Sequence, residues 1–307
     1  MRPDGKRVIA PRFMSSLEQL PSDMIVVGGG VTGAEFVSLF ARLGVRVQWL
    51  VGPRGVLPGF VAEAGQILTE HLSRQGVELL RGQLAQRIEQ TGSGVTVVMA
   101  DGTSHRAAMV FLAIGRTPDL ARLNLAAIGL APAGDGRLAT DLFGRTAVPG
   151  VYAIGDATGG PMLANRAMAQ AWIAGRHAAG AVTPPFQPEA IIHAVYSAPE
   201  IAQVGMLASP EAQVVRVPLS RSLKLHLLDH AEGVLMVAYH PQKRHVLGAL
   251  AAGYHAAELL TPFAIAIQQP TTLDALAVTY SAHPTVSELA FEAARAALIA
   301  AERLVAH

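Results

Sequence analysis

The sequence predicts an α/β protein that continues into an α+β part, and three observations lead to this class. A short apolar run at residues 24–27 enters a glycine-rich loop and then a helical pattern. Strand-like and helix-like segments alternate up to about residue 180, which favours a parallel sheet covered by helices. The composition changes at 183–188, "TPPFQP", where a linker is expected.

The order of elements follows from the hydrophobic periodicity, the apolar runs and the turn residues of the sequence. Gly44 and Gly76 are expected to end the first two helices, and Asp101-Gly102 predicts a hairpin between two strands. The expected strands are 24–27, 45–51, two runs within 95–115, 150–156 ending at Asp156, and several runs between 189 and 252. The expected helices are 34–44, 62–75, 162–180, 255–268 and 285–305.

Composition excludes several classes of function. The formal net charge of +1 with scattered Lys and Arg gives no footprint for nucleic acid or an anionic membrane. No apolar run is long enough to span a bilayer, and no apolar segment follows the basic N-terminus, so a cytoplasmic protein is expected. The sequence contains no cysteine, which excludes disulfides and thiol chemistry within these 307 residues. The histidines lack partners at metal-ligand spacing, so no metal site is expected.

The glycine-rich loop has the pattern G-x-G-x-x-G at Gly28, Gly30 and Gly33. Gly28 allows a tight turn, Gly30 lets a pyrophosphate approach the backbone, and Gly33 lets the helix pack closely on the strand. The pattern alone is weak, but here it follows a strand and opens a helix, and a second strand comes at the right distance. The sequence therefore predicts a Rossmann-type dinucleotide site, with an ordinary strand–helix turn as the alternative.

The end of the second strand should read the adenosine ribose. An acidic residue there favours NAD, whereas arginine favours NADP. This chain has Val51 at the strand end and Arg54 in the loop that follows. Arg54 favours NADP slightly, but a solvated loop arginine is an equal interpretation, so the choice between NAD and NADP stays open.

Five motifs in order resemble the pyridine nucleotide–disulfide oxidoreductase family, near dihydrolipoamide dehydrogenase and soluble pyridine nucleotide transhydrogenase. They are "VVGGGVTGAE" (26–35), "AIGRTPD" (113–119), "VYAIGDATGGPMLAN" (151–165), "VYSAPEIAQVG" (195–205) and "AHPTVSEL" (282–289). The resemblance implies three parts: an NAD(P)-binding Rossmann domain at 1–118, the C-terminal part of an FAD-binding domain at 119–184, and an α+β dimerisation domain at 185–307.

Family members also carry an earlier FAD-binding segment with its own G-x-G-x-x-G and, usually, a redox C-x4-C pair. That segment, about 100–150 residues long, is absent from this sequence. The resemblance therefore implies a truncated or split form, and a separate chain could carry the segment and its thiols. FAD is expected to bind only when that segment is supplied.

The resemblance implies a nucleotide site in the first part. Glu35 would face the nicotinamide carboxamide, although a carboxylate near a helix start also simply stabilises the helix dipole. Val51 and Ala85 would lie near the adenosine, and Gly115 would line the site; Arg116 beside it could be only a surface cation. The loop that would hold the pyrophosphate comprises Gly28, Gly29, Gly30, Val31, Thr32, Gly33, Ala34 and Glu35.

The resemblance also implies flavin contacts after residue 150. Asp156, preceded by Gly155, would accept a hydrogen bond from the ribityl chain, although a simple turn is the alternative. Backbone donors would come from Met162, Leu163, Ala164 and Asn165. Most relatives have histidine at position 165, and an acidic pair with glycine where residues 169–171 read Ala-Gln-Ala, so flavin contact here is altered.

His283 and Glu288 resemble the family's proton-handling pair. His283 would act as general acid/base on a thiol of the other subunit, with Glu288 orienting it, which implies a homodimer. Thr285-Val-Ser-Glu288 also fits a helix capping box. The function implied is an NAD(P)H- and FAD-linked oxidoreductase; the alternative is a non-catalytic NAD(P)-binding or dimerisation module.

Overall fold

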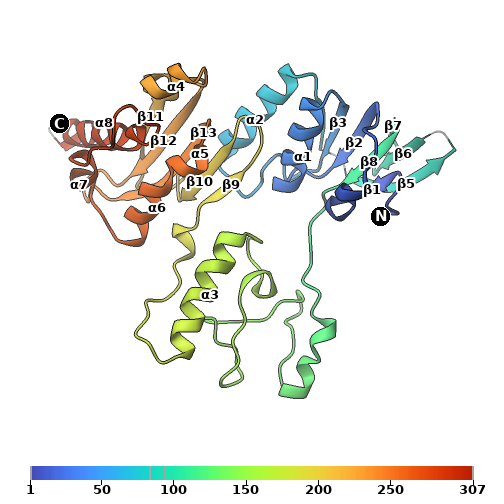
Figure 1. The fold of residues 1–307 in the computed structure, drawn as a ribbon, viewed down its shortest axis with the longest axis horizontal. Coiled ribbons are helices and arrows are strands. Elements are labelled where there is room, and N and C mark those ends of the chain that lie inside the picture. The colour runs from blue at the N-terminus through green and yellow to red at the C-terminus, as the bar shows by residue number, and fades with distance from the viewer. Residues whose placement is uncertain (1, 83, 93, 306–307) are drawn as a thin grey trace.

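The first part of the chain forms a parallel five-stranded sheet with two helices. The computed structural model describes residues 2–82, 84–92 and 94–305. The sheet order is β1-β8-β2-β3-β4, and each neighbouring pair is parallel. Its elements are β1 (Val8–Ile9), β2 (Asp23–Val27), α1 (Val31–Arg42), β3 (Arg46–Val51), α2 (Ala62–Arg74), β4 (Glu78–Arg81) and β8 (Met109–Leu112), shown in blue to green in Figure 1.

This sheet confirms the α/β prediction. The central strand β2 is buried because helices cover one face and a smaller sheet covers the other. Val26 and Trp49 pack with α1 and α2, while Ile25 and Leu50 face the other side. A strand buried on both faces reads as a continuous apolar run, as "MIVV" does.

The smaller sheet contains the predicted hairpin, but the second of the two runs expected within 95–115 is divided between a strand at Ser104–Ala107 in this sheet and β8 of the parallel sheet. β5 (Ala85–Thr91), β6 (Gly94–Met99) and β7 (Ser104–Ala107) pair antiparallel in that order. Asp101 shapes the turn between β6 and β7, because its Oδ1 accepts hydrogen bonds from the backbone N–H and the hydroxyl of Thr103 at 3.0 and 2.6 Å.

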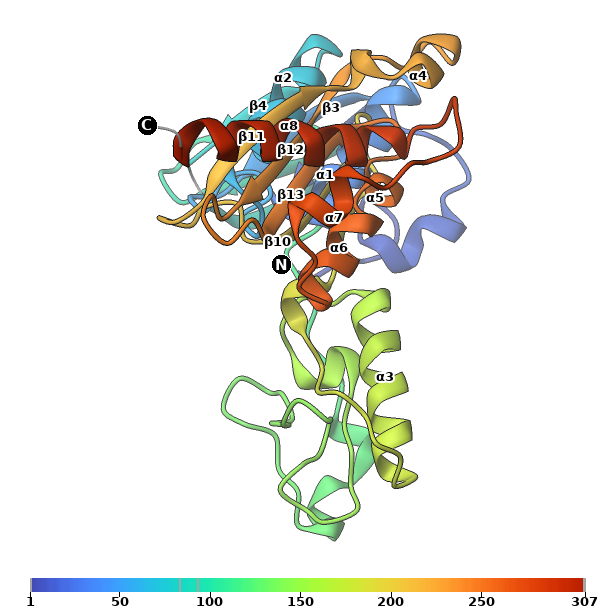
Figure 2. The same ribbon diagram turned by 90° about the vertical axis from the view of Figure 1, so that its left-hand side faces the viewer.

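The middle segment, about 119–190, hangs below the rest of the molecule in both views (Figures 1 and 2). Among its described residues α3 (Ala164–Ala178) is the one α-helix, with short 3-10 turns at Ala121–Leu123, Leu125–Ile128, Gly155–Thr158 and Pro188–Ala190. The prediction of a strand at 150–156 is wrong. Of these residues only Tyr152 pairs with another segment, in an isolated bridge with Arg145. Within the described residues, this extended segment has no neighbouring strand with which to form a ladder.

The C-terminal part is an antiparallel sheet with helices on one face. The sheet order is β11-β12-β13-β10-β9. Its strands are β9 (His193–Val195), β10 (Ile201–Gly205), β11 (Gln213–Pro218), β12 (Gly233–Tyr239) and β13 (Val246–Gly253). Its helices are α4 (Leu223–Leu227), α5 (Ala256–Leu259), α6 (Thr261–Gln268), α7 (Leu273–Ala277) and α8 (Glu288–Val305).

Two helix predictions need correction in this part. The single helix expected at 255–268 is divided into α5 and α6, with Pro262 in the first turn of α6. Proline lacks a backbone N–H and suits a helix start rather than an interior. The last helix begins at Glu288 rather than 285.

The two sheets are joined by one continuous apolar core. Side chains alternate along β12, so Leu235 and Val237 face α8, while Met236 and Ala238 join the core of α1, α2 and the parallel sheet. Polar contacts supplement this packing: Gln203 Oε1 accepts from Val61 N–H at 2.8 Å. The C-terminal sheet therefore packs directly against the first part.

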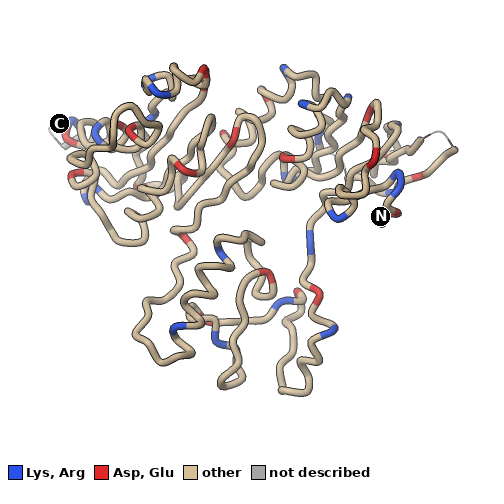
Figure 3. Tube along the Cα trace, viewed as in Figure 1, with Lys and Arg blue, Asp and Glu red and all other residues tan. Residues whose placement is uncertain are grey.

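Charges are interspersed along the chain. Figure 3 shows Lys and Arg alternating with Asp and Glu over all three parts of the trace. No helix within the described residues has the length and apolar character needed to cross a bilayer. The same residues hold no group of three or more His, Cys, Asp or Glu that could bind a metal ion.

Candidate functional site

The glycine loop between β2 and α1 has a different steric requirement at each glycine. Gly28 has φ +124°, and a Cβ there would lie 2.2 Å from Ala113 O. A Cβ on Gly33 would lie 2.0 Å from Gly28 O, so only glycine lets α1 approach the strand. A Cβ on Gly30 would meet nothing within 4 Å, so the outer side of this residue is open. Gly28 and Gly33 therefore serve packing, as does Gly29, where a Cβ would lie 2.4 Å from Gly55 O. Gly30 alone of the four leaves room for a ligand.

Two hydrogen bonds fix the backbone carbonyls of the glycine loop. The Trp49 indole Nε1–H donates to Gly28 O at 2.9 Å, and Leu57 N–H donates to Gly29 O at 2.7 Å. Val31, Thr32 and Ala34 lie in the first turn of α1, whose N-cap is Gly30. No side chain among the described residues caps this N-terminus, so its backbone N–H groups and the positive end of the helix dipole are available to an anion.

Glu35 contacts the C-terminal part. It lies in the second turn of α1, and its Oε1 accepts a hydrogen bond from Tyr196 N–H at 3.0 Å. One turn later, Ser38 Oγ accepts from Ala198 N–H at 2.9 Å. Sequence reasoning missed this pairing, because the "VYSAPE" segment lies 161 positions away. The two side chains fix that segment beside the glycine loop.

The remaining nucleotide candidates surround the end of β3. Val51 is fully buried beneath Gly29, and a Cβ on Gly29 would lie 2.8 Å from Val51 Cγ1. Arg54 is exposed in the following turn. Ala85 is paired with Met99 and packs on the opposite face of the parallel sheet. The exposed Leu84, which sequence reasoning did not single out, lies against Gly52.

The structure brings Arg116, Asp156 and Met162 together. They line one cavity of about 350 Å³, with residues 117–120 and Ala157. Arg116 Nη2–H donates to Met162 O at 3.3 Å, so the segment that leaves the parallel sheet touches the segment before α3. Gly115 has φ +108° and makes this turn possible. The carboxylate of Asp156 is exposed beside the cavity.

Two side chains of α3, not predicted as site residues, hold the turn that presents Asp156. Gln170 Oε1 accepts from Gly155 N–H at 2.8 Å, and Arg166 donates to Gly155 O at 3.3 Å and to Thr158 Oγ1 at 3.1 Å. They are four residues apart, so they share one helix face. Partial burial lowers the pKa of Arg166, against the attraction of the nearby Asp156.

Leu163, Ala164 and Asn165 form the start of α3, with Leu163 as its N-cap residue. The Asn165 side chain is directed to the C-terminal part, because its Nδ2–H donates to Ile192 O at 2.8 Å.

His283 and Glu288 form the predicted pair. His283 Nδ1 lies 2.8 Å from Glu288 Oε1, while Glu288 Oε2 accepts from Thr285 N–H at 2.7 Å. One carboxylate therefore contacts both the imidazole and the Thr285 backbone N–H. The predicted capping box is incomplete, because the Thr285 hydroxyl donates to Ala282 O at 2.8 Å and α8 begins only at Glu288. The two hydrogen bonds to Glu288, from Thr285 first and His283 second, lower the pKa of Glu288. The His283 side chain is 66% exposed, so its ring is accessible from solvent.

Two protein-family models match this chain, one over its first half and one over its C-terminal part. Residues 5–171 match the model described as pyridine nucleotide-disulphide oxidoreductase, and residues 191–294 match the dimerisation domain of the same group. The chain belongs to the pyridine nucleotide-disulphide oxidoreductase family. Members of this family depend on FAD and NAD(P), and its dimerisation domain is associated with homodimers.

Curated relatives in the family include two kinds of enzyme. An NAD(P)H dehydrogenase (quinone) of Mycobacterium tuberculosis is 34% identical over 100% of this chain and 62% of its own length. A dihydrolipoyl dehydrogenase of Halobacterium salinarum is 34% identical over 95% of this chain and 63% of its own. The chain thus spans less than two thirds of the length of these relatives.

A solved structure of a relative confirms that this chain has the fold of the family. The crystal structure of LpdA from Mycobacterium tuberculosis matches with a TM-score of 0.91 and 34% identity, over 96% of this chain and 66% of that one. The resemblance proposed from the five sequence motifs is therefore confirmed at the level of family and fold.

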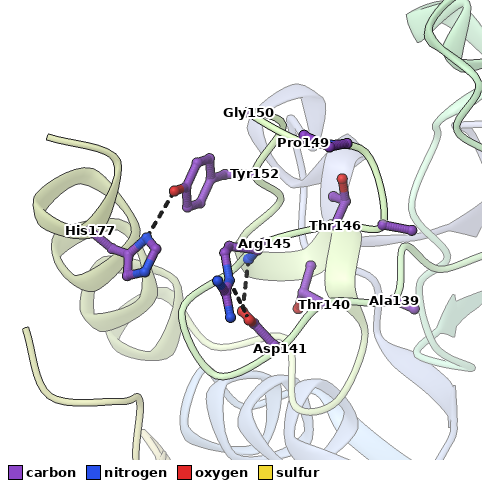
Figure 4. Close-up of a pocket in the computed structure, with 10 residues that line it drawn as sticks. Ala139, Thr140, Asp141, Arg145, Thr146, Pro149, Gly150, Tyr152 and His177 are labelled. Carbon is purple, nitrogen blue, oxygen red and sulfur yellow. Dashed lines mark hydrogen bonds and ion pairs between the residues drawn. The ribbon is translucent and has the colours of Figure 1, made fainter. Parts of the chain in front are cut away.

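This protein also has a larger cavity, which lies in the middle segment and not at the glycine loop. It measures about 700 Å³ and is lined by residues 139–141, 145–147, Pro149, Gly150, Tyr152 and His177 of α3. Tyr152 OH lies 2.8 Å from His177 Nδ1, and Arg145 pairs with Asp141 at 2.6 Å (Figure 4). No residue predicted from the sequence lies here. Gly150 and Tyr152, which line the cavity, belong to the segment 150–156, where a strand was predicted and is not formed.

Replacing Gln170 with leucine is expected to release the Asp156 turn, because it leaves the buried Gly155 N–H without its acceptor. An unsatisfied buried amide costs about 1–3 kcal/mol. Hydrogen exchange at residues 153–158, followed by mass spectrometry, should become at least about fivefold faster. Gln170→Glu keeps an acceptor oxygen and should retain protection. Equal exchange in the leucine variant and the original protein would contradict this positioning role.

Proposed function

We propose that this chain is the nicotinamide-nucleotide and interface part of an NAD(P)H- and FAD-linked oxidoreductase. The observation that carries the proposal is the glycine loop: Gly28 and Gly33 are required by packing, whereas Gly30 leaves open space at an uncapped helix N-terminus. A dinucleotide pyrophosphate fits this combination of space, N–H donors and helix dipole.

The residues present fit one side of FAD. Asp156 offers a free carboxylate beside the cavity that also contains Arg116 and Met162, and α3 begins there without a side-chain cap among the described residues. We infer that Asp156 would accept a hydrogen bond from a ribityl hydroxyl and that the N-terminus of α3 would supply backbone donors. When bound, FAD supplies a two-electron acceptor for the hydride of NAD(P)H.

The chain's own residues would bind and orient the reduced nucleotide. Glu35, fixed by Tyr196 N–H, has a second carboxylate oxygen that can accept from the nicotinamide carboxamide. His283, oriented by Glu288, would hold or release a proton at Nε2 in the active site of a second copy. The 66% exposure of its side chain agrees with a role across a dimer interface.

The final acceptor and the remaining partner are also part of this proposal. Because the 307 residues contain no cysteine, a disulfide step would need thiols from outside them. A quinone-like acceptor, as in the name of the mycobacterial relative, needs no such thiol.

We also propose a partner polypeptide that completes the middle segment and the FAD site. Two features support it: the exposed apolar side chains of Leu142, Met168 and Trp172, and the cavity beside Tyr152. We place this protein in the cytoplasm.

The test is titration of the purified chain with NADH and NADPH by calorimetry, followed by anaerobic addition of FAD. We expect about one nucleotide bound per chain, as one glycine loop implies. Because FAD is expected to bind only when the FAD segment is supplied, the visible flavin band should bleach faster than in buffer only after a polypeptide carrying that segment is added, and not with the chain alone. Absence of nucleotide binding would overturn the proposal. Nucleotide binding without faster bleaching in the presence of that polypeptide would overturn its catalytic part and leave a non-catalytic NAD(P)-binding module.

A further inference from the structure

The segment that follows β9 is anchored to α1 at two alternate positions. Tyr196 N–H donates to Glu35 Oε1 at 3.0 Å, and Ala198 N–H donates to Ser38 Oγ at 2.9 Å. Ser38 is buried, with only 2% of its surface exposed, so the second contact lies inside the protein. The backbone of Tyr196 is therefore fixed directly beside the carboxylate of Glu35.

The Tyr196 side chain projects out of the protein. Val195, the last residue of β9, is fully buried in the core that contains α1 and α2. Successive side chains along a strand point to opposite faces, and Tyr196, which directly follows the strand, is 71% exposed. None of the aromatic pairs formed by the described residues includes Tyr196. A free aromatic ring is thus held at the surface next to Glu35.

The glycine loop offers no aromatic ring of its own, because its side chains are small or aliphatic as far as Glu35. Val31 lies one turn before Glu35 on the same side of α1, since residues four apart in a helix are neighbours. Phe36, which follows Glu35, packs against Phe111 in the core, with ring centroids 4.3 Å apart. Around the Glu35 carboxylate, the exposed ring therefore comes from Tyr196, on the C-terminal part.

We propose that Tyr196 stacks on the nicotinamide ring and covers the reactive end of the nucleotide. The proposal rests on the nucleotide site and on the contact between Glu35 and the carboxamide proposed above. Offset stacking of two aromatic rings is favourable beyond the area that it buries. The oxidised nicotinamide also carries a positive charge, which the face of a tyrosine ring attracts. Tyr196 therefore contributes at least as much to the binding of NAD⁺ as to that of NADH.

The experiment is calorimetric titration of the full chain and its variants with NAD⁺, NADH and ADP-ribose, which has the same pyrophosphate and adenosine but no nicotinamide. In Tyr196→Ala we expect the Kd for NADH to rise about threefold to tenfold, and that for NAD⁺ at least as much. The Kd for ADP-ribose should change less than about twofold. Tyr196→Phe keeps the aromatic face and should bind all three ligands as the original protein does.

Tyr280→Ala is the matched control, because Tyr280 is another exposed tyrosine, at 82%, and lies beyond α7 in the C-terminal part. It should leave all three Kd values unchanged. Equal losses for the three ligands in Tyr196→Ala would show that the residue only shapes the site, and unchanged affinities would place its ring elsewhere. Either result overturns the stacking role while leaving the nucleotide site in place. If the original protein binds none of the three, the nucleotide site itself is refuted.

Discussion

Replacing Gly30 with glutamate is expected to abolish nicotinamide-nucleotide binding while leaving the fold intact. A Cβ on Gly30 meets nothing within 4 Å, so the protein accommodates the side chain. The new carboxylate would lie at the N-terminus of α1, where the helix dipole favours it and where the pyrophosphate is proposed to bind. Repulsion and lost space should raise the Kd for NADH and NADPH by at least about a hundredfold, or ~2.7 kcal/mol.

The measurement is calorimetric titration, with thermal unfolding recorded on the same samples. Gly92→Glu is the matched control, because Gly92 is also free of neighbours within 4 Å and belongs to the turn between β5 and β6, away from the loop. It should bind both nucleotides as the original protein does. If Gly30→Glu binds them equally well, the nucleotide site lies elsewhere.

Replacing Gly33 with alanine should instead destabilise the fold. The added methyl group would lie 2.0 Å from the backbone carbonyl of Gly28, and that carbonyl is held by Trp49. Either α1 moves away from β2 or the loop is displaced. Overpacking typically costs about 1–3 kcal/mol, and a contact of 2.0 Å with backbone places this substitution at the upper end of that range. Alanine gains roughly 1 kcal/mol over glycine in a helix. A net loss of about 2 kcal/mol is therefore expected.

Gly30→Ala provides the comparison within the same motif. It adds the same methyl group where no atom is close, so its free energy of unfolding should change by less than about 0.5 kcal/mol. Urea denaturation of both variants measures the difference directly. Equal stabilities would mean that the closeness of Gly33 to Gly28 is not a constraint on this fold.

The sequence predicted those elements whose pattern is local. The apolar run of β2, the glycine loop and the Asp101 hairpin depend on neighbours in sequence, and each is present in the structure. The strand expected at 150–156 failed because a strand is stabilised by pairing, which no local pattern contains. The short helix α7 was not foreseen either, since its few residues are too short for a period to show.

Contacts between distant segments set the other limit. Glu35 with Tyr196, and Arg81 beside Val51, depend on how the two sheets and their strands are arranged. Gln170 and Arg166 could have been noticed as polar residues four apart in an Ala-rich helix, but their shared partner Gly155 could not. The His283–Glu288 pair was predictable because five residues suffice to place it.

The hydrogen bond from Trp49 to Gly28 gives the glycine loop an optical reporter of its own. The protein has two tryptophans: Trp49 is fully buried, whereas Trp172 is 70% exposed on α3. A buried indole emits at shorter wavelength than one in water, so the two contributions separate in a fluorescence spectrum. Changes on the short-wavelength side follow the loop, and changes on the long-wavelength side follow whatever covers α3.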